Sequence, residues 1–133
     1  MSNRAGLINH RSEHDVTETT RRFRAAAERA GLTIFAEVDH GENAAEVGLA
    51  LRPTRLLIFG NPRGGTPLMQ INQTAGIDLP FKALIWSDEQ GTVWLTYNDP
   101  QWLADRHALG ASADPIVTTI AAGMEKLAAS ATV

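Results

Sequence analysis

"LPFKALIWSDEQGTVWLTYN", residues 79–98, is the stretch that decides the fold. Two runs rich in β-branched and aromatic residues flank a polar connection that ends at Gly91, the residue type that best tolerates a positive φ. This pattern predicts a β-hairpin in which Trp86 and Trp94 face each other across the two strands. Because a hairpin joins antiparallel strands, this part of the sheet needs no crossover helix.

Three more segments outside the hairpin have the pattern of strands. Residues 54–60, "TRLLIFG", are almost continuously apolar, which indicates a central strand. Residues 32–38, "LTIFAEV", place every second apolar side chain on one face, and residues 5–9, "AGLIN", are a weaker candidate. With the hairpin, these segments predict about five strands.

Capping residues mark where the helices begin. Asp15 and Glu18 have capping-box spacing before an apolar stripe, and Gly31 is expected to end this first main helix. Asp39 offers a cap for a short helix that carries Asn43. Three further starts place a capping residue before a proline, which the first helical turn tolerates: Thr66-Pro67, Asp99-Pro100 and Asp114-Pro115. The last of these is expected to open the second main helix.

Length and composition complete the prediction of the fold. The 133 residues are 44% hydrophobic and 20% charged, which is ordinary for one soluble globular domain. We therefore predict a single α+β domain over residues 1–133. Its expected architecture is a mainly antiparallel sheet of about five strands with two main helices packed on it.

Composition also limits the function. The chain has no cysteine, which excludes disulfides and thiolate chemistry. Its net charge of −3 provides no general field that attracts nucleic acid or an anionic membrane. No apolar run reaches the roughly 20 residues that a membrane span needs, and the N-terminal residues lack the apolar core of a signal peptide. We therefore predict a cytoplasmic protein with neither a nucleic-acid partner nor a membrane partner.

The glycine-rich stretch "GNPRGGTPLM", residues 60–69, has the spacing of a phosphate-binding loop but lacks its lysine. Pro62 and Pro67 also remove two backbone N–H donors, which argues against nucleotide hydrolysis. Two interpretations stay open. The Arg63 side chain, two glycine amides and the Thr66 hydroxyl could bind a small anion, or the stretch could only turn the chain and start a helix.

Short motifs run in order across most of the chain, and none is specific alone: Asp39-His40, Asn43-Ala44, Gly48, Leu51-Arg52-Pro53, Phe59-Gly60-Asn61-Pro62, Gly65-Thr66-Pro67-Leu68-Met69, Asp78-Leu79-Pro80, Tyr97-Asn98-Asp99-Pro100 and Arg106-His107. As a set, they resemble the domain of unknown function 302 family. The resemblance implies an α+β domain that forms a homodimer and occurs in bacteria and archaea. It implies no reaction and supplies no catalytic residue.

Polar residues at predicted strand ends and loops are the candidates for a ligand site: His40, Asn43, Asn61, Arg63, Asp78, Tyr97 and His107. We expect folding to gather them around one solvent-accessible hollow. For each residue, a purely structural role as a helix cap or loop brace stays open.

The two histidines suggest a more specific chemistry. His40 follows a strand at the start of a helix, where its neutral form is favoured and suits a general base or a metal ligand. Together with His107 and a carboxylate from Asp78 or Asp99, it would suit zinc or iron. No metal-binding spacing such as HExxH supports this site, so we predict neither a metal nor a cofactor.

The function favoured at this point is a homodimeric small-molecule-binding module whose polar pocket takes a small anionic ligand. Two alternatives remain. One is an enzyme that uses His40 or His107 in acid–base or metal chemistry. The other is a structural or protein-interaction domain without a ligand.

Overall fold

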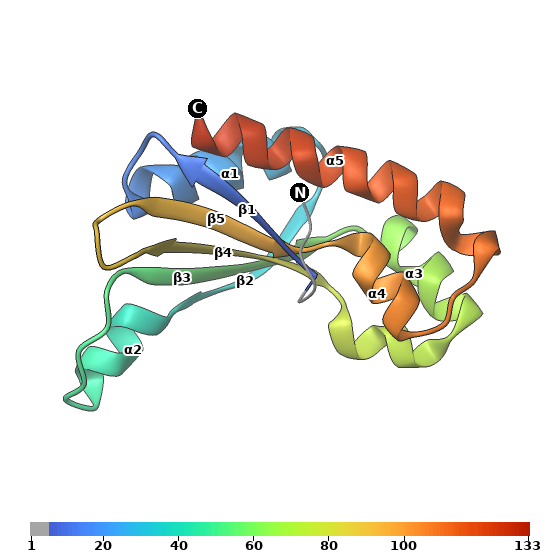
Figure 1. Ribbon diagram of the computed structural model, residues 1–133, viewed down its shortest axis with the longest axis horizontal. Helices are drawn as coiled ribbons and strands as arrows, with labels where there is room; N and C mark the ends of the chain where they lie inside the picture. Colours follow the sequence, from blue (N-terminus) through green and yellow to red (C-terminus); the bar gives the residue numbers. More distant parts are fainter. Residues whose placement is uncertain (1–5) are drawn as a thin grey trace.

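The computed structural model describes residues 6–133, in which five antiparallel strands form one sheet with two long helices over one face (Figure 1). The order of strands across the sheet is β1-β5-β4-β3-β2. The first strand therefore pairs with the last, and β2 forms the opposite edge. The strand bounds are Leu7–Ser12 (β1), Thr33–Asp39 (β2), Thr54–Gly60 (β3), Phe81–Ser87 (β4) and Val93–Asn98 (β5).

The helices form two groups. The long helices α1 and α5 lie side by side over the sheet, while α3 and α4 lie beyond one end of the strands and α2 beyond the other (Figure 1). Two short 3-10 helices follow in the chain: η1 lies between α3 and β4, and η2 lies between α4 and α5. The bounds are Val16–Arg29 (α1), His40–Glu46 (α2), Pro62–Ile71 (α3), Gln73–Asp78 (η1), Pro100–Arg106 (α4), Ala111–Ala113 (η2) and Asp114–Thr132 (α5). This architecture confirms the predicted α+β fold.

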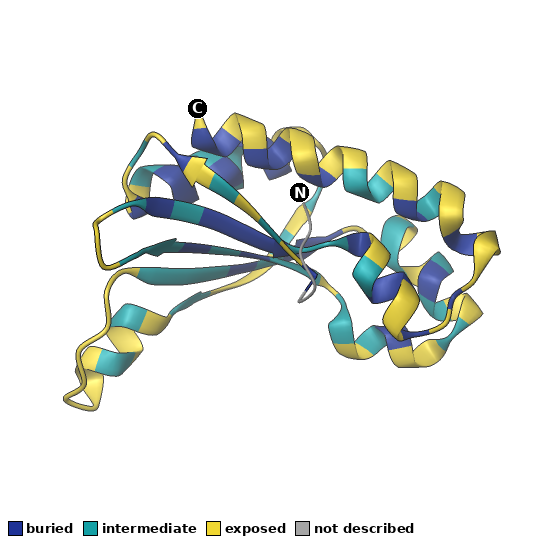
Figure 2. Ribbon diagram, in the orientation of Figure 1, coloured by how far each residue is buried: buried dark blue, intermediate teal, exposed yellow. Residues whose placement is uncertain are grey.

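The main hydrophobic core fills the space between the sheet and the two long helices. Every second side chain of the central strands points into it, as the period of a strand requires, and Figure 2 shows these buried positions as dark bands. Phe23 of α1 meets Phe59 of β3 edge to face, with ring centroids 5.0 Å apart. Both rings are 1% exposed, so this aromatic pair lies at the centre of the core.

A second, smaller core holds the connecting helices to the end of the sheet. Its buried members include Leu68 of α3, Leu103 of α4 and Val117 of α5. Phe81 and Ile120 touch both cores, so the two are continuous. This continuity fixes the position of α3, η1 and α4 relative to the strands.

The hairpin forms as predicted. Trp86 lies directly opposite Trp94, and Gly91 has a φ of 81°. β3 lies between β2 and β4, which confirms its central position. The first strand covers residues 7–12 rather than the predicted 5–9, because it pairs with β5 along its whole length; residue 5 lies outside the described residues.

Three of the predicted helix caps are confirmed. The side chains of Asp15, Asp39 and Asp99 each accept a hydrogen bond from a backbone N–H in the first turn of the helix that follows. At all three positions the capping residue is extended and satisfies a donor that the helix itself leaves free.

Two other predicted helix starts are wrong. α3 begins at Pro62, not after Thr66, because Asn61 and Pro62 provide the same pattern of cap and proline five residues earlier. Asp114 lies inside the first turn of α5 and does not cap it; there its charge still favours the positive end of the helix dipole.

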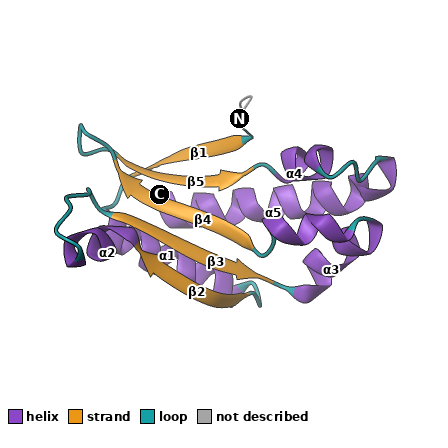
Figure 3. Cartoon of the chain, turned by 90° about the horizontal axis from the view of Figure 1, so that it is seen from below, coloured by secondary structure: helices purple, strands orange, loops and turns teal. Residues whose placement is uncertain are grey.

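The face of the sheet that points away from α1 and α5 has no helix over its central strands within residues 6–133 (Figure 3). We call this surface the open face. Strand register assigns the following apolar side chains to it: Val38, Leu56, Ile58, Leu84, Trp86 and Trp94.

Candidate functional site

The residues expected to share one hollow lie in separate parts of the molecule. In the pairing of β2 with β3, Asp39 lies opposite Arg55 and Thr33 lies opposite Gly60. Because the strands are antiparallel, α2 starts at one end of the sheet and α3 at the other. The length of β3, about 20 Å, separates them. The expectation that His40, Asn61, Tyr97 and His107 gather in one place is therefore corrected.

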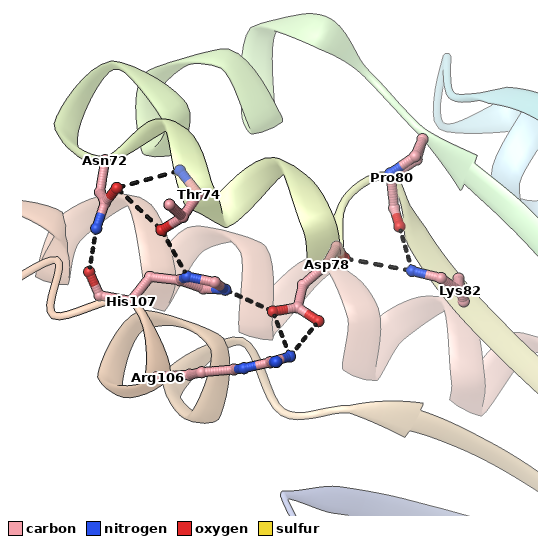
Figure 4. A network of polar contacts seen from close by, with 7 residues as sticks. All are labelled: Asn72, Thr74, Asp78, Pro80, Lys82, Arg106 and His107. Atoms are coloured by element: carbon pink, nitrogen blue, oxygen red, sulfur yellow. Dashed lines mark hydrogen bonds and ion pairs between the residues drawn. The ribbon is translucent and has the colours of Figure 1, made fainter.

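The structure does bring together Asp78 and His107. Nε2 of His107 lies 2.5 Å from Oδ2 of Asp78, and Nδ1 of the same ring lies 3.0 Å from the Thr74 hydroxyl (Figure 4). Arg106 adds a second partner for the carboxylate, with Nη1 3.0 Å from Oδ1 of Asp78. The His107 side chain is 7% exposed and that of Asp78 is 13% exposed, so this network is largely shielded from solvent.

Local structure explains why these side chains meet. Asn72 caps η1 by accepting a hydrogen bond from the backbone N–H of Thr74, and its amide nitrogen donates to the backbone oxygen of His107. Asp78 ends η1, and His107 ends α4. The network thus joins both ends of η1 to the C-terminal end of α4 (Figure 4).

The network engages both ring nitrogens of His107 and both carboxylate oxygens of Asp78. A general base needs a ring nitrogen directed at a substrate, and here each nitrogen is directed at a protein partner. The arrangement is suited to clamping η1 against α4. Ligand binding by Asp78 and His107 stays a prediction.

Tyr97 lies in a different environment, on the core side of β5. Its ring is 3% exposed, and its hydroxyl donates to Oε2 of Glu125 on α5 at 3.1 Å. The ring stacks on His10 of β1 with centroids 5.9 Å apart. Nε2 of His10 lies 3.2 Å from the same Glu125 oxygen, although without the angles of a hydrogen bond. Tyr97 therefore links the sheet to α5.

Burial, and then the adjacent Glu125 carboxylate, raise the pKa of Tyr97 far above its ordinary value. The unfolded chain releases this proton near pH 10, so the stability that the neutral phenol contributes is present below about pH 10 and is lost as the pH rises above it.

This shift gives a clean prediction, because Tyr97 is the single tyrosine of the chain. In a spectrophotometric titration, the folded protein is expected to show no tyrosinate absorbance at about pH 10–11, whereas the urea-unfolded chain titrates near pH 10. The Tyr97→Phe variant provides the baseline. Coincident titration curves for the folded and unfolded protein would contradict the assigned environment.

Asn61 and Arg63 lie at the start of α3. The Asn61 side chain accepts a hydrogen bond from the backbone N–H of Arg63 at 2.9 Å and so caps the helix. The Arg63 side chain is exposed. Two apolar hollows of about 220 and 300 Å³ flank Asn61; the first is lined mainly by Phe35, Met69, Leu79 and Phe81, the second mainly by Leu32, Phe59, Ile120 and Met124.

His40 and Asn43 are exposed on α2, a helix that buries none of its residues. The nearby hollow of about 530 Å³ lies between the starts of α1 and α2 and contains side chains that we did not predict as site residues, including Asp15, Glu42 and Arg55. Sequence spacing gave no signal for it, since its two sides lie more than twenty residues apart in the chain.

The geometry also bears on the metal alternative. Among residues 6–133, no three or more His, Asp or Glu side chains are placed so that they could hold a metal ion. His40 and His107 belong to different ends of the sheet, so the site that would combine them is not formed.

Sequence reasoning missed several partners in these networks: His10, Asn72, Thr74 and Glu125. One signal was present, because Asn72 and Thr74 have the two-residue spacing of a side-chain turn cap. The contacts of His10 with Tyr97 and Glu125 depend on the pairing of β1 with β5, which local patterns do not determine.

The chain is similar to named proteins of Brucella. It is 51% identical over 119 residues to "Fluoride-specific ion channel FluC 1" of Brucella suis and to the protein of the same name from Brucella abortus. In both cases the match covers 90% of this chain, but 47% and 44% of the respective relatives. The chain thus spans about half the length of the curated relatives it matches.

These relatives contradict the function and the partners predicted from the sequence. We predicted a small-molecule-binding module, with an enzyme or a ligand-free interaction domain as alternatives, and no membrane partner. The relatives are instead named as ion channels, which work in membranes. Residues 6–133 themselves contain no helix with the length and apolar character needed to cross a membrane.

The fold and the family are shown by two further comparisons. A solved structure described as an uncharacterized conserved protein DUF302 from Bacillus stearothermophilus matches with a TM-score of 0.73 and 23% identity, over 96% of this chain and 95% of that one. The family model described as "Domain of unknown function DUF302" matches residues 8–127. The chain therefore belongs to the DUF302 family.

Proposed function

We propose that this chain is an accessory domain of a fluoride-channel system, which acts on a fluoride-specific ion channel whose pore lies outside it. The observation that carries this proposal is the 51% identity over 90% of the chain to less than half of each named channel. In these relatives the matched segment is part of a channel protein. We therefore expect a separate domain of similar sequence to act next to the same kind of channel.

The two long helices, α1 and α5, pack their apolar sides against the sheet, which supports an accessory role. α5 directs Met124, Leu127 and Ala128 into the core, while the charged Glu125 and Lys126 stay exposed between them. This is the pattern of a helix that covers a sheet in water. α1 has the same division, so both long helices are already used in the core. We therefore assign the pore to the more than half of each relative that the match leaves out.

The proposal also includes a location. We assign the domain to the cytoplasmic side of the membrane, as predicted from the sequence, where it would meet the water-facing surface of the channel. Protease treatment of right-side-out vesicles is expected to leave the domain intact, and permeabilised vesicles are expected to lose it.

Fluoride efflux provides the direct test of the accessory role. The Brucella suis relative is expressed in full length and without the 119 residues that match this chain, and efflux from fluoride-loaded cells is followed with a fluoride-selective electrode. We expect deletion of the matched segment to change the efflux rate, and we expect this chain, supplied as a separate protein, to restore the full-length rate.

The control is the Phe23→Ala variant of the chain, which is expected to be unfolded in part and should restore efflux less well. Equal efflux from the full-length and the shortened relative, with or without this chain, would show that the domain does not act on the channel.

A further inference from the structure

The open face of the sheet is an apolar surface built by four neighbouring strands. Leu56 lies directly opposite Leu84, and Trp86 lies directly opposite Trp94, so these pairs form adjacent cross-strand rows. Val38 of β2 extends the first row. The side chains are half-buried by one another, and no helix covers them within residues 6–133 (Figure 3). A continuous apolar surface of this kind marks an interaction site.

The two tryptophan rings can be covered by a partner that excludes water from them. Nε1 of Trp86 donates to the Thr96 hydroxyl at 2.9 Å, and Nε1 of Trp94 donates to Oδ2 of Asp88 at 2.9 Å. Both indole N–H groups are therefore satisfied within the domain. A partner can cover the rings without leaving a buried donor unpaired, which is the usual cost of covering tryptophan.

Charge indicates what kind of partner fits. The strand positions that face this side carry two cations, Arg11 of β1 and Lys82 of β4, and among the described strands they carry no carboxylate. A second copy of this chain would set the same cations against strands without acidic side chains, and the nearby Asp88 carboxylate of the hairpin turn is already bound by the Trp94 indole and two backbone N–H groups. A partner with carboxylates around an apolar centre complements the open face better.

The size of the open face also argues against a second, untethered copy of this chain as its partner. Five strands about 4.8 Å apart and about 20 Å long cover roughly 500 Å², whereas a stable interface between free partners buries about 800 Å² on each side. A smaller contact suffices when both partners belong to one chain, because a tether supplies an effective concentration of about 1 mM. In the named relatives, the matched segment and the rest of the channel protein share one chain.

We propose that the open face docks on the fluoride channel, with its tryptophan and leucine rows against an apolar patch of the channel's water-facing surface and with channel carboxylates opposite Arg11 and Lys82. This inference rests on the proposed accessory function and names the surface through which it works.

A binding experiment tests the surface separately from the function. The probe is the Brucella suis relative without its 119 matched residues, purified in detergent and immobilised on a surface. This chain is supplied as a free protein at up to about 1 mM, the effective concentration that a tether would provide, and its affinity is measured. Leu84→Glu places a carboxylate in the centre of the open face. Ile77→Glu is the matched control, because Ile77 is 73% exposed and lies on η1, outside the strands that form the open face. We expect Leu84→Glu to weaken binding about tenfold or more, and Ile77→Glu to leave it unchanged.

A second pair of variants keeps the test valid if Leu84→Glu fails to fold. Lys82→Glu reverses one cation of the open face and keeps its apolar side chains, although it removes the hydrogen bonds from the Lys82 ammonium to the backbone oxygens of Asp78 and Pro80. Lys126→Glu makes the same charge change on the exposed side of α5. Only Lys82→Glu is expected to weaken binding, again about tenfold, and the loss should diminish in high salt.

Three results would contradict the docking surface or the accessory function. If the wild-type chain binds and all four variants bind equally, the open face is not the docking surface, although the accessory function stands. If the wild-type chain does not bind at all, the accessory function fails and the inference with it. If the chain is a dimer in sedimentation and Leu84→Glu converts it to a monomer, the open face belongs to a second copy and the inference is overturned.

Discussion

Replacement of Phe23 by alanine is expected to destabilise the protein by about 3–5 kcal/mol. Phe23 is 1% exposed and packs edge to face on Phe59, so its removal leaves a cavity between α1 and the sheet that both long helices prevent from collapsing. Since domains of this kind have a total stability of about 5–15 kcal/mol, the variant is expected to lose a large share of it.

Thermal denaturation followed by circular dichroism measures this effect. For a chain of this length, the loss corresponds to a fall in Tm of roughly 12–20 °C. Glu28→Ala, an exposed change on the same helix, is the matched control and is expected to stay within about 0.5 kcal/mol of the wild type. A Tm for Phe23→Ala within a few degrees of the control would contradict the central role of this ring.

The second large effect concerns the clamp between η1 and α4. His107→Ala is expected to cost about 2–4 kcal/mol, because it removes a buried ring and leaves the shielded Asp78 carboxylate with only the exposed Arg106 as a charged partner. Asp78→Ala is expected to cost about 1–3 kcal/mol, since Nε2 of the buried His107 ring then loses its carboxylate partner, while Nδ1 keeps the Thr74 hydroxyl.

A double-mutant cycle shows whether the two side chains act together. The variant that carries both changes is expected to lose less stability than the sum of the single variants, by about 1 kcal/mol or more. Asp105→Ala removes an exposed carboxylate from the same helix and should have almost no effect. Strictly additive losses in urea denaturation would show that the contact contributes nothing to stability.

Local chemistry made much of the fold predictable. The hairpin followed from the two apolar runs around Gly91, and the caps at Asp15, Asp39 and Asp99 followed from side chains that satisfy free N–H donors. Where two equivalent signals competed, prediction failed: Asn61-Pro62 and Thr66-Pro67 both mark a helix start, and the chain uses the earlier one, where the Asn61 side chain accepts a hydrogen bond from the backbone N–H of Arg63.

The candidate site was harder to predict, because it depends on which strand ends lie together. His40 and Asn61 both follow strands, and the sequence suggested that both could line one hollow. The antiparallel pairing of β2 with β3 sends them to opposite ends of the sheet. The contact between Asp78 and His107 bridges 29 residues and arises only after η1 and α4 have packed.

The wrong prediction about membrane partners has a similar cause. Net charge and the lack of a long apolar run describe this chain alone. They carry no information about the protein in which its relatives place the same domain, and 51% identity to named channels supplied that context.

The pairing of β1 with β5 affects how the protein emerges from the ribosome. β1 ends at Ser12 and β5 begins at Val93, so at about 5–20 residues per second the first strand waits roughly 4–16 s for its partner to be translated. Throughout that interval its backbone N–H and C=O groups are available to chaperones or to other nascent chains. Synthesis of β5 gives β1 its pairing partner. A stall in translation before Val93 therefore leaves β1, which is synthesised before the other four strands, unpaired.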